Sequence, residues 1–172
     1  MGSIETDFKE VEPDLIKDNI FKLVGSDWML ITAGTIENYN TMTASAGGFG
    51  MLWKKQICFC AIRPKHYTYH FMEKAKSFTL SFFEEKYRSV LEFCGSMSGR
   101  DVDKAAAVGI TPIEGNFGTV YFAEARLVME CKKIYFQDID PDHFIDPKIY
   151  DRYPDRNYHR IYIGEVMRCL IR

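Results

Sequence analysis

The sequence predicts a mainly β protein, an antiparallel β-barrel with inserted helices, and two observations support this fold class. Apolar, strand-like runs dominate both ends of the chain, whereas segments with helical spacing cluster between Thr68 and Val108. A parallel sheet would instead need strands and helices that alternate along the whole chain. Because a chain of 172 residues can bury about two-thirds of its unfolded surface in one core, we expect a single domain over residues 1–172. Residues 1–18 can form a flexible tail.

The first strands are expected to form a hairpin and a buried strand. Residues 28–35 are an apolar, partly β-branched run, and turn residues at 37–40 separate it from a second extended segment that begins at Thr41. Residues 57–62 are uniformly apolar and too short for a surface helix, so they predict a buried strand that ends before Pro64.

A strand, helix, strand unit follows this buried strand. Thr68 is a candidate N-cap of a short helix that runs through Ala75. The strand pattern then resumes at residues 78–83.

Two further helices are expected before the last third of the chain. Residues 84–94 have apolar side chains at helical spacing, and Gly95 stands where a left-handed C-terminal cap is needed. A shorter helix over residues 101–108 has Ser98 as a candidate cap and Gly109 as its terminator.

The last third of the chain predicts strands around one long loop. Residues 119–133 alternate imperfectly, which favours one bent or bulged strand that continues through residues 134–136. Residues 138–155, rich in Asp, Pro and aromatic residues, predict a long excursion with little regular structure that serves as a lid or a subunit contact. Residues 158–170 alternate again and carry Gly164, so we expect a final strand that closes the barrel.

Composition excludes several classes of function. The net charge is −2 with interspersed signs, so the chain has no electrostatic footprint for nucleic acid or an anionic membrane. No apolar run reaches the ~20 residues that span a bilayer, and no signal peptide opens the chain. The five cysteines form neither a CxxC unit nor the paired spacing of a secreted disulfide framework. We therefore expect a cytoplasmic protein with reduced thiols.

The segment from residue 40 to residue 53 has a composition suited to binding a flat polar ring. Small and hydroxylated residues are followed by glycines and then aromatic residues. Backbone N–H groups can approach a ligand closely there, because no bulky side chain intervenes. Thr43, Ala44 and Ser45 are the candidate donors. The alternative is an ordinary strand that ends in a Gly-rich turn.

Two blocks could bind a phosphate dianion. Residues 63–68, Arg-Pro-Lys-His-Tyr-Thr, combine a cation at a strand end with a hydroxyl and the open N–H groups of a helix start. Residues 94–104 place a Gly-rich turn before another helix, with Arg100 and Lys104 nearby. Either block alone is equally compatible with a capped helix and solvated charges.

Other site chemistries find less support. His66 and His70 could share a helix face, but no further ligands accompany them, so no metal site is predicted. Cys94 would be redox-active if its thiol were exposed near a helix start, although such a cysteine is more often a small core residue. No hydrolase motif is present.

Four motifs occur in order: Met-Thr-Ala-Ser at 42–45, Arg-Pro-x-x-Tyr-Thr at 63–68, Thr-Leu-Ser-Phe-Phe at 79–83 and Ser-Gly-Arg-Asp-x-x-Lys at 98–104. This arrangement resembles the flavin reductase-like family with an FMN-binding split barrel, in particular its flavoredoxin-type branch. The resemblance covers residues 19–112 and reappears at residues 159–165. It implies a Greek-key antiparallel split barrel.

The resemblance also implies the cofactor, its partners and a set of binding residues. FMN would be bound tightly or exchangeably, NAD(P)H would donate a hydride, and the flavin would pass electrons to an acceptor. A homodimer would build the flavin pocket at its subunit boundary. The implied cofactor-binding residues are Thr43, Ala44, Ser45, Ala46, Arg63, Tyr67, Thr68, Ser81, Phe82, Cys94, Ser98, Gly99, Arg100 and Lys104. No catalytic side chain is assigned, because flavin reduction needs no protein acid or base.

One residue departs from the family pattern, and two other functions stay open. Ala46 stands where several relatives carry Trp, so Phe49 or Trp53 would have to supply an aromatic wall over the flavin. The first alternative function is an electron carrier or flavin-storage protein that does not react with nicotinamide. The second is a barrel that binds another planar ligand or none and acts as an interaction module.

Overall fold

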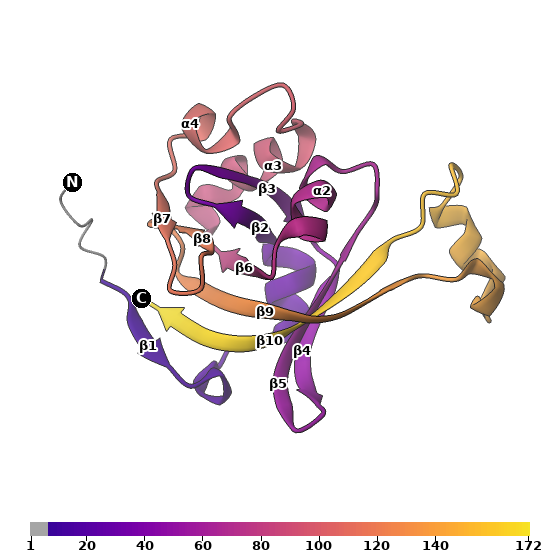
Figure 1. The fold of residues 1–172 in the computed structure, drawn as a ribbon, viewed down its shortest axis with the longest axis horizontal. Helices are drawn as coiled ribbons and strands as arrows, with labels where there is room; N and C mark the ends of the chain where they lie inside the picture. Colours follow the sequence, from indigo (N-terminus) through magenta and orange to yellow (C-terminus); the bar gives the residue numbers. More distant parts are fainter. Residues whose placement is uncertain (1–6) are drawn as a thin grey trace.

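Within residues 7–172, which the computed structural model describes, eight strands form one antiparallel sheet (Figure 1). Neighbours follow the order β3-β2-β6-β9-β10-β5-β4, β1 also pairs with β10, and β7 pairs separately with β8. The strands are β1 Lys9–Val11, β2 Met29–Thr35, β3 Asn38–Ala44, β4 Gly47–Leu52, β5 Lys55–Ile62, β6 Ser77–Phe82, β7 Pro112–Glu114, β8 Val120–Phe122, β9 Leu127–Asp138 and β10 Arg160–Ile171. The predicted mainly β, antiparallel fold class is confirmed.

The sheet curls without closing. Its two edge strands, β3 and β4, are separated in sequence only by Ser45 and Ala46. The edges must therefore approach each other, although no hydrogen-bonded ladder joins them. The expectation that the last strand closes the barrel is wrong, because β10 lies inside the sheet, between β9 and β5. Alternation shows that a segment is a strand but not which neighbours it takes.

The longer helices α2, α3 and α4 lie beside strands β2, β3 and β6, whereas the short segments η4 and η5 lie on the projecting arm (Figure 1). The helices of the described part are α1 Ile20–Lys22, α2 Tyr67–Lys74, α3 Arg88–Ser96 and α4 Lys104–Val108, with a π-helical segment η2 Leu23–Asp27 and 3-10 segments η1 Pro13–Leu15, η3 Glu85–Tyr87, η4 Pro141–His143 and η5 Pro147–Arg152. None of these helices, within residues 7–172, is long and apolar enough to cross a bilayer.

The predicted helix caps need correction. The N-cap of α2 is His66, and Thr68 lies inside the helix, where its Oγ1 accepts a hydrogen bond from Asn40 Nδ2 at 2.7 Å. Gly95 lies inside α3 and does not cap it. The N-cap of α4 is Asp103 and not Ser98, which lies five residues before. A tertiary contact occupies Thr68, so local capping preference did not decide its role.

The left-handed terminator of α4 is confirmed. Gly109 has φ 71° and ψ 32°, and its N–H donates to the carbonyl of Ala105. Glycine adopts this conformation without a Cβ penalty.

Two strand predictions need correction as well. Residues 119–133 are not one bent strand: β8 ends at Phe122 and β9 begins at Leu127, with a turn between them. The Gly-rich stretch from Gly47 forms strand β4, which pairs with β5. A Cβ at Gly47 would lie 2.4 Å from the carbonyl oxygen of Phe59, so the glycine allows the two backbones to approach.

The apolar core has two parts, one on each face of β2. Met29, Ile31 and Ala33 belong to the cluster inside the curved sheet, whereas Leu30 packs with α3, α4 and β8. Successive side chains of a strand point to opposite faces, so a strand buried on both faces is apolar throughout. This explains the uninterrupted apolar run that predicted β2.

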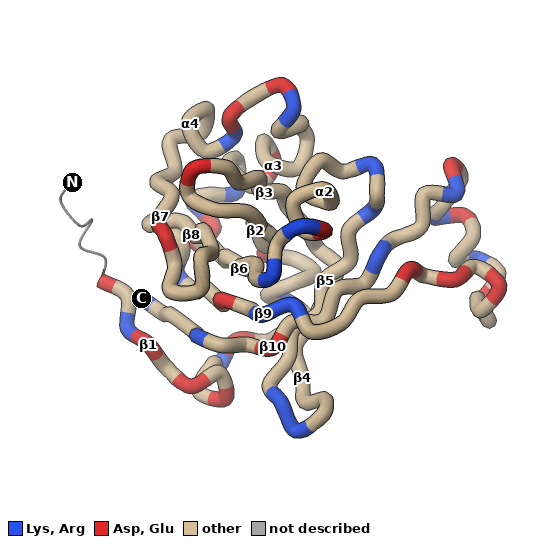
Figure 2. The backbone as a smooth tube through the Cα atoms, viewed as in Figure 1, with Lys and Arg blue, Asp and Glu red and all other residues tan. Residues whose placement is uncertain are grey.

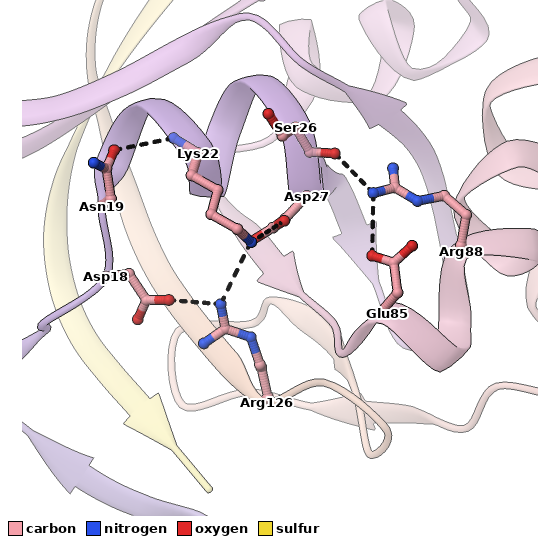
Figure 3. A network of polar contacts seen from close by, with 8 residues as sticks. All are labelled: Asp18, Asn19, Lys22, Ser26, Asp27, Glu85, Arg88 and Arg126. Carbon is pink, nitrogen blue, oxygen red and sulfur yellow. Dashed lines mark hydrogen bonds and ion pairs between the residues drawn. The ribbon is translucent and has the colours of Figure 1, made fainter.

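An ionic network holds the N-terminal segment on the sheet (Figure 3). Arg126, which directly precedes β9, lies 2.6 Å from Asp18 and 4.0 Å from Asp27. Arg88 of α3 donates to the carbonyl of Ser26 at 2.7 Å. Together with the pairing of β1 and β10, these contacts connect much of the region where a tail was expected to the rest of the fold. Residues 1–6 lie outside the described part.

The predicted excursion forms the end of a projecting arm, residues 139–159 (Figure 1). It contains η4 and η5 between the extended ends of β9 and β10, whose register there pairs Asp138 with Arg160. Acidic and basic residues are interspersed along the arm and the body, consistent with the small net charge (Figure 2). Tyr153 is buried among the arm's own Phe144, Tyr158 and His159, and Arg63 lies over its ring.

Candidate functional site

A cavity of about 390 Å³ lies where α2, α3 and the loop before α4 meet the edge strand β3. We call it the α2–α3 cavity. It brings together residues from three predicted segments: Thr43, Tyr67, Thr68, Cys94, Ser98, Gly99, Arg100 and Lys104. Asn40, Met42 and residues 65–66 and 95–97 complete its lining. The two blocks proposed for phosphate binding thus border one space.

The buried cation Lys104 is the main electrostatic feature of the α2–α3 cavity. Only 6% of Lys104 is exposed, and its Nζ donates to the carbonyls of Thr41 at 2.9 Å and Cys94 at 2.7 Å. Burial lowers the pKa of Lys104. Within residues 7–172, no Asp or Glu forms an ion pair with it. A buried cation without an opposite charge is costly, and an anion in the cavity would relieve that cost.

A second cation, Arg100, lies at the exposed rim of the cavity. Its Cζ lies 4.8 Å from the centroid of the Tyr67 ring, and its Nη2 lies 3.2 Å from His70 Nε2. Its backbone N–H donates to Ser98 Oγ at 3.2 Å. Arg100 can therefore reach an anion at the rim while Lys104 lies below it.

Gly99, in the turn before Arg100, packs closely against the buried side-chain amide of Asn40, which leaves no room for a larger residue. A Cβ at Gly99 would lie 1.8 Å from Oδ1 of Asn40, and Asn40 in turn donates to Thr68. Both Asn40 and Thr68 are buried. This chain of contacts connects β3, α2 and the loop before α4. Asn40 is absent from the predicted binding set, and only its place at the start of the small-residue segment pointed to it.

His66 adds an unpaired polar atom to the cavity lining. Its Nδ1 is buried and has no hydrogen-bond partner within the described residues, and its side chain does not cap α2. Burial, followed by the charges of Lys65, Arg63 and Lys104, lowers the pKa of His66. The ring is therefore neutral at pH 7. An orphaned ring nitrogen beside an uncapped helix start can take part in binding an anionic ligand.

Arg63 lies outside the α2–α3 cavity. Its Nη2 donates to the carbonyl of Arg152 at 2.9 Å, and its Cζ lies 5.0 Å from the centroid of the Tyr153 ring. Arg63 therefore attaches the arm to the body. Although it belongs to the same motif as Tyr67 and Thr68, the structure does not bring it together with them.

Cys94 lines the cavity as a buried thiol. Burial raises its pKa to about 11, so the thiol stays protonated at pH 7. A redox-active cysteine needs an exposed, stabilised thiolate. The structure favours the core alternative, in which the carbonyl of Cys94 helps to hold Lys104.

The small-residue segment is divided between cavity, core and surface. Thr43 lines the cavity, and its Oγ1 donates to the carbonyl of Leu91 at 2.5 Å, which connects β3 to α3. Ala44 is buried in the core. Ser45 and Ala46 are exposed at the connection between the two sheet edges.

The remaining predicted residues belong to the interior of the sheet. Ser81 and Phe82 of β6 are both fully buried, and neither lines the cavity. The ring of Phe82 packs against Phe49 at 6.0 Å between centroids. Trp53 packs at 6.0 Å against Tyr135, at the tip of the β4–β5 hairpin.

Solved flavoproteins have similar folds. Flavoredoxin of Desulfovibrio vulgaris (Miyazaki F) is 21% identical with a TM-score of 0.67, and the match covers 94% of this chain and 77% of that one. An FMN-binding protein from Thermus thermophilus is 19% identical with a TM-score of 0.66, over 94% and 80%. The NADH:FAD oxidoreductase SgcE6 of Streptomyces globisporus is 16% identical with a TM-score of 0.65, over 85% and 75%. Among curated proteins, none matches the sequence significantly.

At these identities the neighbours establish the fold, and the family follows from the sequence itself. The model of the flavin reductase like domain matches residues 21–172. The predicted resemblance is thereby confirmed, and the chain belongs to the flavin reductase-like family.

Proposed function

We propose that the protein is an FMN-binding oxidoreductase that takes a hydride from NAD(P)H. A flavin-related redox function follows from the family. The single observation that carries the finer assignment is the α2–α3 cavity, where Lys104 is buried close to an uncapped helix start and has no carboxylate partner among residues 7–172.

The residues present in the cavity fit the phosphate of FMN. Lys104 and Arg100 would supply positive charge, and the hydroxyls of Ser98 and Thr68 are at hand. The orphaned Nδ1 of His66 and the turn at Gly99, where no side chain fits, support the same assignment. Charge-assisted hydrogen bonds of this kind are the stronger class in proteins.

The protein's contribution to the reaction would be binding and orientation. When bound, a flavin supplies the hydride-accepting and electron-passing chemistry. Thr43 holds β3 on α3 and so sets the width of the cavity. The small residues from Ala44 to Ala46 allow a planar ring to approach the backbone between the two sheet edges.

Anaerobic spectroscopy tests this function. We expect the purified protein to bind FMN and the flavin band near ~450 nm to bleach when NADH or NADPH is added. A flavin-loaded protein whose band persists with both nucleotides would instead be the electron carrier or storage protein. A colourless protein that gains no thermal stability from FMN would contradict flavin binding.

We also propose a cytoplasmic homodimer. Exposed apolar side chains occur on the arm and on the β4–β5 hairpin, with Ile145 98% exposed and Trp53 57% exposed. Burying such residues against a second copy would be favourable. Sedimentation analysis of the flavin-loaded protein tests this, since a monomer with full FMN occupancy would contradict it. The free cysteines are compatible with a reducing compartment.

A further inference from the structure

A second and larger cavity, of about 510 Å³, lies on the other side of Tyr67. We call it the Phe117 cavity. One wall is a face of α2 with Tyr67, His70, Phe71 and Lys74, which are three or four residues apart and therefore neighbours on the helix. Lys76 and the β7–β8 loop with Phe117 form other parts of the wall. Its volume is in the range of small-molecule sites.

The Phe117 cavity combines aromatic surface with positive charge. The rings of Tyr67 and Phe71 meet edge to face with centroids 5.2 Å apart, and Phe117 is 43% exposed. Lys74 and Lys76 are exposed, and within residues 7–172 neither forms an ion pair. No Asp or Glu is among its described lining residues. Aromatic faces with two unpaired lysines suit a planar ligand that carries a phosphate.

The two cavities are neighbours. Tyr67 lines both, and Arg100 of the α2–α3 cavity approaches His70 of the Phe117 cavity to 3.2 Å. A ligand with one phosphate between Lys104 and Arg100 could therefore extend past Tyr67 and place a second phosphate and a base near Lys74 and Phe117.

We propose that the Phe117 cavity binds an adenosine 5′-phosphate group. The adenine stacks on the aromatic wall, and the phosphate contacts Lys74 and Lys76. Such a group occurs at the end of FAD and in nicotinamide dinucleotides. The link to a flavin rests on the proposed function, whereas the adenylate site itself depends only on this cavity.

The direct test is calorimetric titration of the whole protein with adenosine 5′-phosphate. We expect the natural protein to bind adenosine 5′-phosphate, and we expect its affinity to fall roughly tenfold in the double variant Lys74→Ala, Lys76→Ala. The separate variant Phe117→Ala should lose affinity to a similar extent. Lys148→Ala, an exposed lysine on the arm, is the matched control and should change nothing. Adenosine without phosphate should be insensitive to the lysine substitutions. Because these side chains are at the surface, thermal unfolding without ligand should be unaltered.

The source of the group is decided by comparing FAD with FMN. If FAD binds roughly tenfold more tightly than FMN and the lysine double variant abolishes the difference, the cavity holds the end of FAD. If the two flavins bind equally and adenosine 5′-phosphate competes with NADH, it holds the nicotinamide dinucleotide. The inference is overturned if the lysine substitutions alter neither adenosine 5′-phosphate nor FAD binding. If the natural protein binds adenosine 5′-phosphate but does not bind FMN, only the proposed function is overturned.

Discussion

Lys104 and Arg63 both belong to motifs that predict binding of the flavin phosphate, yet they lie in different environments in the structure. Lys104 is buried in the α2–α3 cavity, where it donates hydrogen bonds to two carbonyls and pairs with no carboxylate of the described residues. Arg63 points to the arm, where a carbonyl and the ring of Tyr153 satisfy it. The comparison teaches that the partners of a cation, more than its motif, indicate whether it is available to a ligand.

The largest expected effect is that of Lys104→Met on FMN affinity. The substitution keeps the aliphatic volume but removes the buried charge, so we expect a loss of about 2–3 kcal/mol, measured by flavin fluorescence titration. Lys86→Met is the control, because Lys86 is exposed, pairs with Glu84 and does not line the α2–α3 cavity. Unchanged affinity in a folded Lys104→Met protein would place the phosphate elsewhere.

Gly99→Ala should have the next largest effect. The new Cβ would lie 1.8 Å from Asn40 Oδ1, so either the turn or the buried Asn40 side chain, both of which line the cavity, must shift. We expect FMN affinity to fall by about 1–2 kcal/mol in the same titration. Gly25→Ala is a matched control, since a Cβ there meets nothing within 4 Å. Equal affinity in both variants would mean that the turn does not contact the ligand.

The attachment of the arm should depend on pH through His159. Its Nδ1 lies 2.7 Å from Tyr153 Oη, and burial, followed by the charges of Arg63 and His66, lowers the pKa of His159 to about 4 from a usual value of 6.5. The folded state favours the neutral ring, so this stabilisation is present above pH 6.5 and is lost as the pH falls toward 4.

Denaturant unfolding at several pH values measures this dependence. The unfolding free energy of the natural protein should decrease relative to that of His159→Gln as the pH falls from 6.5, because glutamine does not titrate. Parallel curves for the two proteins would contradict this prediction, because they would mean that folding does not lower the pKa of His159.

The smallest effect on FMN is expected for Arg63→Ala. Since Arg63 contacts Arg152 and Tyr153 and not the cavity, FMN affinity should stay within about 0.5 kcal/mol of the natural value. The arm should instead become more susceptible to limited proteolysis. A loss of affinity as large as that of Lys104→Met would abolish the distinction between the two cations.

Much of the fold could be predicted from local pattern. The apolar run and turn that form the β2–β3 hairpin, the buried β5 and the terminator Gly109 were all recognisable. Strand β4 was missed because its glycines resemble a turn, and their reason lies in the close approach of β5. The cap of α2 was misplaced because Asn40, distant in sequence, bonds to the hydroxyl of Thr68.

Strand periodicity and the order of the four motifs were enough to predict the antiparallel fold class and the family, because these features depend only on residues close together in the sequence. Tertiary structure alone decided which cation is buried, which strands form the sheet edges and how two cavities share Tyr67. Those outcomes depend on contacts between distant segments, such as Lys104 with Thr41 and Arg63 with Arg152. The energy of such a contact depends on how deeply the residue is buried and on which group it contacts. The neighbouring sequence determines neither of these.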